Sequence, residues 1–514
     1  MMKKLVAVAA VLTVSVPLFA SEPAACAEIT VDPGREIRPI GIMNAVNNGP
    51  AVKNPNGDQV RGNFEDYKAL QIPYARTHDS INCVNGGAHT CDISAVFPDF
   101  DADENDPKNY DFVFTDHYLD SMVRAGTKVF YRLGQTIEHG PKKYGVLPPK
   151  DFAKWARICE HVVRHYNEGW GWGVDDHPTT VNVAWSNQFN IAYWEIWNEP
   201  DLDSWDTKGP NGLPGYPRCW WGTETNFFRL YETTAKHLKA KFPNLKIGGP
   251  GLCGNYEWDD RFLAYCRDRQ VPLDFHSWHI YSLEPNTVAG LCVKIRRMLD
   301  RHGFEKTESI LDEWNTVKGW TDDYLYSMNM ICGAHEQRGA AFVAATMIAC
   351  SRQPLDMLMY YDARHTTVFN GMFDRVRLLP LKAYYAFAAW RKLLKLGTEV
   401  GCTVAESNGE KSDSMTGVGL DQVSVAAKGQ YYAIAAKGKG GKGALFVARY
   451  SSDDNTSDTG RVTIRIPGAD LENARVLLTD SVRTFTDVPL ENATSGSGVI
   501  RMQPNSFALV EYDL

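Results

Sequence analysis

The sequence predicts a (β/α)8 barrel followed by a small C-terminal β-domain, because three features of the 514-residue chain agree. Short apolar, strand-like runs alternate with amphipathic helical stretches from about residue 40, which is the rhythm of parallel strands joined by helices. Eight such runs are present. After about residue 397, Gly-rich turns and alternating strand patterns replace the helical ones. We therefore expect an α/β barrel in residues 40–396 and an accessory β-sandwich in residues 397–514.

The predicted barrel strands follow one another along the chain as PIGIMN, YARTHD, KVFYRLG, IAYWEIWNE, LKIGGPG, DFHSWHIYS, SILDEWN and DMLMYYDAR. Between them lie helical patterns such as KDFAKWARICEHVVRHYNEG, in which apolar residues recur three or four positions apart. The segment 28–39, ahead of the first barrel strand, also has a strand pattern. We expect it to form an N-terminal strand that joins the C-terminal β-domain.

Residues 1–27 are predicted to be a secretory signal peptide. Lys3 and Lys4 precede an apolar run from Leu5 to Ala20, and small residues lead up to Glu28. The run is shorter than the roughly 20 residues of a membrane-spanning helix, and no later segment predicts a membrane span. The residues before Cys26 fit a lipid-anchoring signal poorly. We expect a secreted or periplasmic protein without a lipid anchor at Cys26.

Composition excludes some classes of function. The net charge of −8 gives no electrostatic reason to expect nucleic-acid binding. The 14 Trp and 23 Tyr fill cores in most proteins, but their flat faces also stack on sugars. Among the 11 cysteines, Cys83 and Cys91 are the best candidate for a disulfide, and no Cys or His spacing indicates a metal site. We expect neither a metal nor a cofactor.

Polar residues gather where the predicted strands end, and barrel active sites lie at those ends. Because residues two apart share a face of a strand, Arg76 and His78 should point the same way, as should His279 and Tyr281. The strand ends carry neither a Gly-rich phosphate loop nor a Ser or Cys nucleophile turn. Their inventory of acids, rings and hydrogen-bond donors is typical of sugar chemistry.

Two carboxylates stand out within this inventory. Glu199 ends the fourth predicted strand and Glu313 the seventh, so they should face each other across the barrel mouth. Such a pair performs glycoside hydrolysis, in which one acid protonates the leaving oxygen while the other attacks the sugar or activates water. Alternation separates Asp312 from Glu313. We assign Glu313 to the mouth and Asp312 to a structural contact with a neighbouring helix.

The motifs WNEPD and DEWN resemble the two catalytic signatures of the clan A glycoside hydrolases, which are retaining enzymes. GIMNAVNNGP, YARTH, KIGGPG, HIY and the trailing β-domain look like glycoside hydrolase family 39, which includes β-xylosidases and α-L-iduronidases. The resemblance covers nearly the whole mature chain. Asp312 departs from it, since the family more often has a small residue before its nucleophile.

The resemblance implies a role for seven of the eight expected site residues, all except Trp314, which its place at a strand end suggests. Glu199 would be the general acid/base, Glu313 the nucleophile, and Asn198 a partner of the sugar 2-hydroxyl. Tyr281 would hydrogen-bond the nucleophile. The other expected substrate-binding residues are Arg76, His78, His279 and Trp314.

Retaining catalysis requires carboxyl groups about 5 to 5.5 Å apart. We expect burial and the negative charge of Glu313 to raise the pKa of Glu199, and Arg76 to keep Glu313 ionised. Glu195 lies deeper in the same strand as Glu199, and we expect it to be a buried acid that pairs with Arg132 or Arg76.

The sequence therefore predicts a secreted retaining glycoside hydrolase that acts on an oligosaccharide or polysaccharide. The leading expectation is exo action on a pentose-containing glycan, with release of xylose or arabinose. An endo-acting clan A glycanase and a non-catalytic carbohydrate-binding barrel are the alternatives. The sequence specifies neither the sugar and its linkage nor the oligomeric state.

Overall fold

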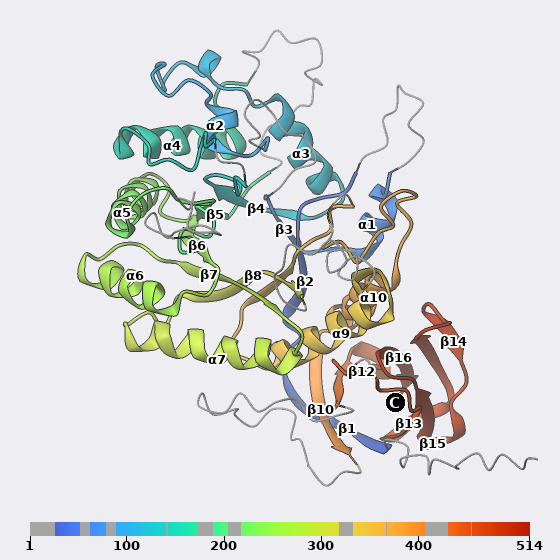
Figure 1. Ribbon diagram of the computed structural model, residues 1–514. Coiled ribbons are helices and arrows are strands. Elements are labelled where there is room, and N and C mark those ends of the chain that lie inside the picture. Colours follow the sequence, from blue (N-terminus) through green and yellow to red (C-terminus); the bar gives the residue numbers. More distant parts are fainter. Residues whose placement is uncertain are drawn as a thin grey trace, which may run out of the picture.

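Eight parallel strands close into a barrel in the computed structural model of the protein, and helices surround it (Figure 1). The structure describes residues 26–51, 62–78, 89–139, 142–172, 189–203, 217–317, 333–365, 367, 369–406, 430–453 and 455–514. The barrel strands are β2 (Ile42–Asn47), β3 (Tyr74–Arg76), β4 (Lys128–Leu133), β5 (Tyr193–Ile196), β6 (Lys246–Leu252), β7 (Phe275–Ser282), β8 (Glu308–Thr316) and β9 (Met357–Tyr360). Each predicted strand overlaps an observed one, and the predicted barrel is confirmed.

The helices of the described residues are α1 (Phe64–Leu70), α2 (Ile93–Val96), α3 (Val113–Arg124), α4 (Phe152–Glu168), α5 (Glu224–Lys241), α6 (Tyr256–Asp268), α7 (Pro285–Arg301), α9 (Gln337–Ser351) and α10 (Lys382–Leu396). Local sequence sets their ends. Asp151 caps the first backbone N–H groups of α4, and Gly169 ends that helix in the left-handed conformation at φ 79°. Within the described part of the chain, no helix combines the length and the apolar character that crossing a bilayer requires.

The interior of the barrel has an apolar floor with a polar layer above it. Tyr193, Phe275 and Ile310 belong to the floor, where the rings of Phe130 and Tyr193 stack 5.2 Å apart. Because side chains two residues apart share a face, the next inward positions on three strands are Glu195, Ser277 and Asp312. The residues that follow the polar layer reach the mouth of the barrel.

The C-terminal β-domain is built from β1 (Cys26–Pro39), β10 (Thr398–Glu406), β11 (Gln430–Lys437), β12 (Lys442–Tyr450), β13 (Gly460–Thr479), β14 (Thr486–Val488), β15 (Glu491–Met502) and β16 (Ser506–Asp513). β1 pairs antiparallel with β10 and parallel with the start of β13. The far end of β13 pairs with β14 and β16. From Cys26 onward, the chain therefore contributes a strand to the β-domain, builds the barrel and then returns to the β-domain.

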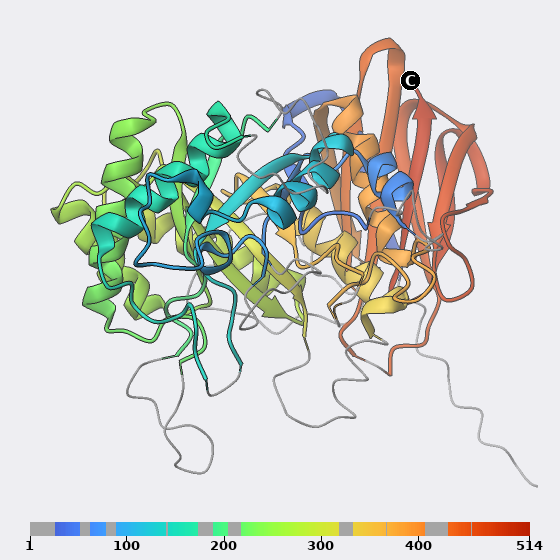
Figure 2. The same ribbon diagram turned by 90° about the horizontal axis from the view of Figure 1, so that it is seen from above.

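The barrel and the β-domain share a packed interface. α9 lies between them in both views (Figures 1 and 2), where it contacts β11, β12 and β16, and its residues 339–351 are all buried. A helix that is apolar on all sides is expected to be buried in this way. Arg352 extends the interface through an ion pair with Glu399 at 2.8 Å and a hydrogen bond to the carbonyl of Ala433 at 3.0 Å. The Tyr450 hydroxyl donates to the carbonyl of Leu283 at 2.6 Å.

Candidate active site

Two carboxylates meet at the mouth of the barrel. Glu199 comes just after β5, and Glu313 lies near the end of β8. One carboxylate oxygen from each, together with a ring nitrogen of His279, lie within 4.8 Å of one another. The side chains of Glu199 and Glu313 are 12% and 8% exposed, whereas that of Arg76 beneath them is fully buried. The two acids are therefore the members of the polar cluster that face an incoming ligand.

The backbone around Glu199 turns sharply as the chain leaves β5. Trp197 and Glu199 both adopt left-handed conformations, at φ 80° and 48°, which non-Gly residues hold only when the surroundings fix them. The Glu199 N–H donates to the carbonyl of Gly251 at 2.9 Å, and the Trp197 indole donates to the carbonyl of Cys219 at 2.8 Å. These bonds fix the direction of the Glu199 side chain.

Gly251 sits at the centre of the site, where a larger residue would intrude. At φ 62°, a Cβ on this residue would lie 3.1 Å from Nε2 of His279 and 3.2 Å from Nη2 of Arg76. One residue after Pro200, Asp201 accepts the backbone N–H groups of Cys253 and Asn255 at 3.0 and 2.9 Å. The loops after β5 and β6 are thereby joined. Burial raises the pKa of Asp201 to about 6 despite these two hydrogen bonds.

Three side chains contact the Glu313 carboxylate in addition to His279, whose Nδ1 lies 3.7 Å from Oε2. The hydroxyl of Tyr281 donates to Oε1, as the family resemblance implies. Arg76 Nη1 donates to Oε2 at 3.3 Å, and Nε2 of His78 lies 3.6 Å from the same oxygen. Arg76 and His78 come from β3 and the residues after it, and Tyr281 comes from β7. Strands on two sides of the barrel thus orient one carboxylate.

Arg76 is the hub of the buried polar layer. Its Nε lies 2.7 Å from Glu195 and 3.0 Å from Asp312, and Nη2 donates to Oδ1 of Asn198 at 2.7 Å. Glu195 therefore pairs with Arg76, one of the two partners that the sequence suggested. The other, Arg132, pairs with Asp92 at 2.6 Å.

The placement expected for Asp312 is wrong. Its carboxylate faces Arg76 and His279 inside the barrel and is fully buried, instead of contacting a helix. The cause is an irregularity between β7 and β8, in which Trp278 pairs with Leu311 but His279 pairs with Glu313. One extra residue in β8 interrupts the alternation, so Asp312 and Glu313 both point inward.

The same bulge separates Trp314 from the other expected substrate-binding residues. Trp314 is fully buried outside the strand ring, with its ring 5.4 Å from that of Tyr360 and 6.0 Å from that of Phe342 in α9. Its position is that of a core residue. The other seven candidates, which are Arg76, His78, Asn198, Glu199, His279, Tyr281 and Glu313, all lie in the one cluster.

The electrostatics of Glu199 also differ from the expectation. Burial raises the pKa of Glu199, but the hydrogen bond with His279 at 2.8 Å and the positive charges nearby outweigh burial, so the pKa lies below its usual range. Burial lowers the pKa of His279, and the carboxylates of Glu313 and Asp312 then raise it well above its usual range. In the free site the proton of the Glu199–His279 pair thus resides on the ring.

Asn47 and Cys219 also belong to the site, although the sequence did not single them out. Asn47, at the end of β2, accepts from Arg76 at 3.1 Å and donates to the carbonyl of Asp312 at 2.7 Å. The Cys219 thiol lies 3.8 Å from Oε2 of Glu199. Strand-end position could have found Asn47 had the first strand been extended beyond Asn44. Nothing local marks Cys219, since it approaches through a loop.

Two further expectations concern cysteines and metals. Cys83 lies outside the described residues, so its expected pairing with Cys91 is not described.

Glu199, His279 and Glu313 have the spacing of metal ligands. Arg76 places a positive charge beside Glu313, one of these three residues.

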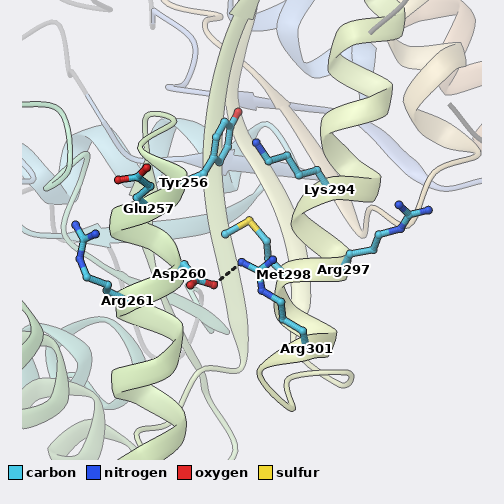
Figure 3. A pocket seen from close by; sticks show the side chains of 8 residues that line it. All are labelled: Tyr256, Glu257, Asp260, Arg261, Lys294, Arg297, Met298 and Arg301. Carbon is cyan, nitrogen blue, oxygen red and sulfur yellow. Dashed lines mark hydrogen bonds and ion pairs between the residues drawn. The ribbon is translucent and has the colours of Figure 1, made fainter. Parts of the chain in front are cut away.

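A pocket of about 640 Å³ lies elsewhere, on the outer surface between α6 and α7 (Figure 3). Its charges are largely compensated locally. Arg301 pairs with Asp260, and Arg261 makes two hydrogen bonds of 2.8 Å to Glu224. Lys294 lies over the ring of Tyr256. We interpret this pocket as a charged outer surface of the barrel.

Comparison with known proteins agrees with this geometry. The sequence profile of the glycosyl hydrolases family 39 matches residues 29–370. The chain belongs to this family. The resemblance seen in its motifs is thereby confirmed.

Two curated relatives are named β-xylosidase. The protein from Geobacillus stearothermophilus is 29% identical over 342 residues, which are 60% of this chain and 62% of the relative. The protein from Caldicellulosiruptor saccharolyticus is 23% identical over 306 residues, 55% of this chain and 57% of the relative. The aligned region thus spans less than two thirds of each relative.

Solved structures resemble the whole chain in fold. A glucosidase from Croceicoccus marinus superimposes with a TM-score of 0.66 at 20% identity, covering 95% of this chain and 99% of its own. The family 39 enzyme from Xanthomonas axonopodis pv. citri gives 0.61 at 17% identity, covering 97% and 99%. At these identities the likeness establishes the shared two-domain fold.

Proposed function

We propose that this family 39 enzyme is an exo-acting glycosidase that releases a pentose, xylose or arabinose, from a glycan, with Glu313 as nucleophile and Glu199 as general acid/base. The observation that carries the assignment is the closeness of the two carboxylates, whose nearest oxygens lie within 4.8 Å. A retaining pair needs such closeness for direct attack, whereas an inverting pair leaves room for a water between its carboxyl groups. The names of the curated relatives support xylose as the first sugar to test.

In the first step, an oxygen of Glu313 attacks the anomeric carbon while the bond to the leaving oxygen breaks. Glu199 transfers a proton to that oxygen as it departs. Arg76 and Tyr281 hold Glu313 from the sides, so its free electron pair is directed at the substrate. The products of this step are a glycosyl ester on Glu313 and a released alcohol.

In the second step, Glu199 takes a proton from water, and the oxygen of that water attacks the anomeric carbon from the face that the leaving group vacated. The bond to Glu313 breaks, and the sugar leaves with its original configuration. Once Glu313 is esterified, its negative charge is gone, which weakens the hold on the proton of the Glu199–His279 pair. The same carboxyl group can therefore serve as acid and then as base.

Asn198 is proposed to bind the sugar 2-hydroxyl through its amide nitrogen. Its carbonyl oxygen already faces Nη2 of Arg76 at 2.7 Å and Nε2 of His78 at 3.1 Å. Both lone pairs of that oxygen are thus occupied, and the NH2 group remains as the donor to a sugar oxygen.

A panel of aryl glycosides tests the function. Nitrophenol release would be measured from α- and β-linked xylosides, arabinosides, glucosides, galactosides, fucosides and iduronides. We expect strong release from a pentoside that Glu313→Ala abolishes. The exposed Glu305 lies just before β8 and makes a matched control for the same substitution. Full activity in Glu313→Ala would refute the nucleophile assignment. Activity on internal bonds of xylan with silence on aryl pentosides would favour the endo-acting alternative.

We also propose that the protein is exported and that residues 1–27 are removed. The support is the basic start and apolar run of this segment, which lies mostly outside the described residues. Mass measurement of the protein from the native host's culture medium or periplasm should give a chain that begins near Glu28. An intact N-terminus on cytoplasmic protein would contradict export.

A further inference from the structure

Asp312, at the bulge in β8, is a buried acid that lies next to the catalytic pair. Regular alternation from Ile310, in the barrel floor, brings Asp312 to the inner face, and the extra residue then turns Glu313 inward as well. A bulge beside an active site commonly re-aims a side chain in this way. The result is two consecutive inward acids, of which Glu313 reaches the mouth and Asp312 is fully buried.

His279 lies between Asp312 and Glu199. Oδ1 of Asp312 is 3.4 Å from Nε2 of His279, and Oε1 of Glu199 is 2.8 Å from Nδ1 of the same ring. We propose that Asp312 is a positioning residue that keeps a proton on Nε2 of His279, so that Nδ1 of this ring exchanges a proton with Glu199. The proposal rests on the assignment of Glu199 as general acid/base.

The carboxylate of Asp312 determines which nitrogen of the His279 ring carries the proton. A neutral imidazole has one N–H group, and the partner of one nitrogen decides which nitrogen carries the proton. With the Asp312 carboxylate beside Nε2, that nitrogen keeps its proton. Nδ1 is left to donate when the ring is charged and to accept when it is neutral. Without Asp312, the proton of a neutral ring could move to Nδ1, and Glu199 could then not donate to it.

The ionisable groups around the ring decide its charge. They are Glu195 and Glu199 from β5 and the turn after it, Asp312 and Glu313 from β8, Arg76 and His78 from β3 and the residues after it, and Tyr281 from β7. Burial raises the pKa of Glu195 to about 8. Asp312 has its pKa held below the usual range by Arg76 and His279, against the effect of burial. Asp312 is thus the ionised acid behind the ring.

The proton transfer balances without an added reactant. The Nδ1–H bond of the charged ring breaks as an O–H bond forms on Glu199, and the ring becomes neutral with its proton on Nε2 facing Asp312. Glu199 then passes its proton to the leaving oxygen. When Glu199 later takes a proton from water, the reverse transfer recharges the ring. The buried cluster keeps a constant number of protons over one turnover apart from the one exchanged with substrate.

The test compares Asp312→Asn with Glu195→Gln, because both acids contact Arg76 but only Asp312 has a resolved ion pair with His279. Nitrogen-15 NMR of histidine-labelled protein reports the charge and tautomer of His279, whose signals are assigned by their loss in His279→Gln. In the wild type we expect both ring nitrogens to be protonated at pH 7. In Asp312→Asn the ring should lose its proton at a pH lower by about one unit or more, the usual effect of one nearby opposite charge.

Activity provides the second measurement. In Asp312→Asn, the alkaline limb of the kcat/KM profile should shift to lower pH by about as much as the deprotonation of the ring does. In Glu195→Gln the limb should stay at the wild-type pH. Both expectations concern the position of the limb on the pH axis and not the maximal rate. A His279 ring that is neutral at pH 7 in the wild type overturns the proposal even if Asp312→Asn does not fold. Equal limbs in both variants, together with an Asp312→Asn ring that loses its proton at the wild-type pH, also overturn it. If Glu199 is not the acid/base, the NMR shift persists while the rate profile stays fixed, which separates the two failures.

Discussion

Replacing Arg76 with Met should cost about 3 to 5 kcal/mol of stability at neutral pH, the usual result of removing one partner from a buried ion pair. Arg76 is fully buried and contacts Glu195, Asp312 and Glu313 at 2.7, 3.0 and 3.3 Å. Met fills a similar volume but leaves these acids facing one another in the barrel interior. Since domains are stable by only about 5 to 15 kcal/mol, the loss is a large share of the total.

The loss should depend on pH in a defined direction. Arg76 contributes to a folded-state pKa of Asp312 below the usual range, so the ion pair stabilises the fold above the unfolded pKa of about 3.9 and loses its effect as pH falls through the folded pKa. The difference between wild type and Arg76→Met should therefore be full at pH 7, nearly full at pH 4 and smaller as the pH falls further. Urea denaturation followed by tryptophan fluorescence measures it.

Arg261→Met is the matched control, because the Arg261 side chain is 53% exposed and pairs with Glu224 at the surface. Exposed pairs contribute about 0 to 1 kcal/mol. Equal destabilisation by Arg76→Met and Arg261→Met, or a loss at Arg76 that does not vary with pH, would refute the reasoning.

Three further predictions concern single side chains. Tyr281→Phe removes the hydroxyl that donates to Glu313. It should lower kcat roughly 10- to 150-fold, because a hydrogen bond to a charged group contributes about 1.5 to 3 kcal/mol. An unchanged kcat would show that this hydrogen bond does not contribute to catalysis. Glu199→Ala should spare the first step on activated aryl leaving groups, which need little protonation, and slow poor leaving groups strongly; equal losses measured on both would contradict its acid role. Trp314→Phe should leave KM nearly unchanged, because the indole is fully buried on the outer side of the barrel strands. The urea midpoint should fall. A large rise in KM with unchanged stability would instead place the indole in contact with substrate.

Strand order and the residues at strand ends could be predicted because each depends on local pattern. Alternation along β3 and β7 correctly grouped Arg76 with His78 and His279 with Tyr281, which all lie in the site. A barrel brings the ends of its strands together wherever they stand in the chain. Local pattern and closed topology were therefore sufficient to assemble most of the cluster.

The misplaced residues share one cause, the bulge between β7 and β8. A single extra residue is invisible to a pattern of period two, and it turned Glu313 inward beside Asp312, which alternation therefore predicted to face a helix and which instead lies next to His279. It also directed Trp314 into the core. The floor residue Ile310 carried the only signal, because its inward side chain implies that Asp312 points inward too.

The pKa of Glu199 could not be predicted from the sequence because its direction depends on competition among contacts. Burial and the charge of Glu313 suggested a raised pKa, but the ring of His279 lies 2.8 Å from Glu199 and outweighs them. The sequence places Glu199 and His279 at the same barrel mouth, but it does not give the distance between them. The approach of Cys219 to Glu199 is likewise a product of loop packing.

Trapping the covalent intermediate tests the central claim most directly. A 2-deoxy-2-fluoro xyloside or arabinoside with an activated leaving group would be incubated with the enzyme, and the labelled peptide identified by mass spectrometry. We predict one sugar attached to Glu313 in the peptide that contains DEWN, and no label in Glu313→Ala. A label on Glu199 or another residue, or turnover of the natural linkage with inversion of configuration by proton NMR, would contradict the assignment of Glu313 as nucleophile.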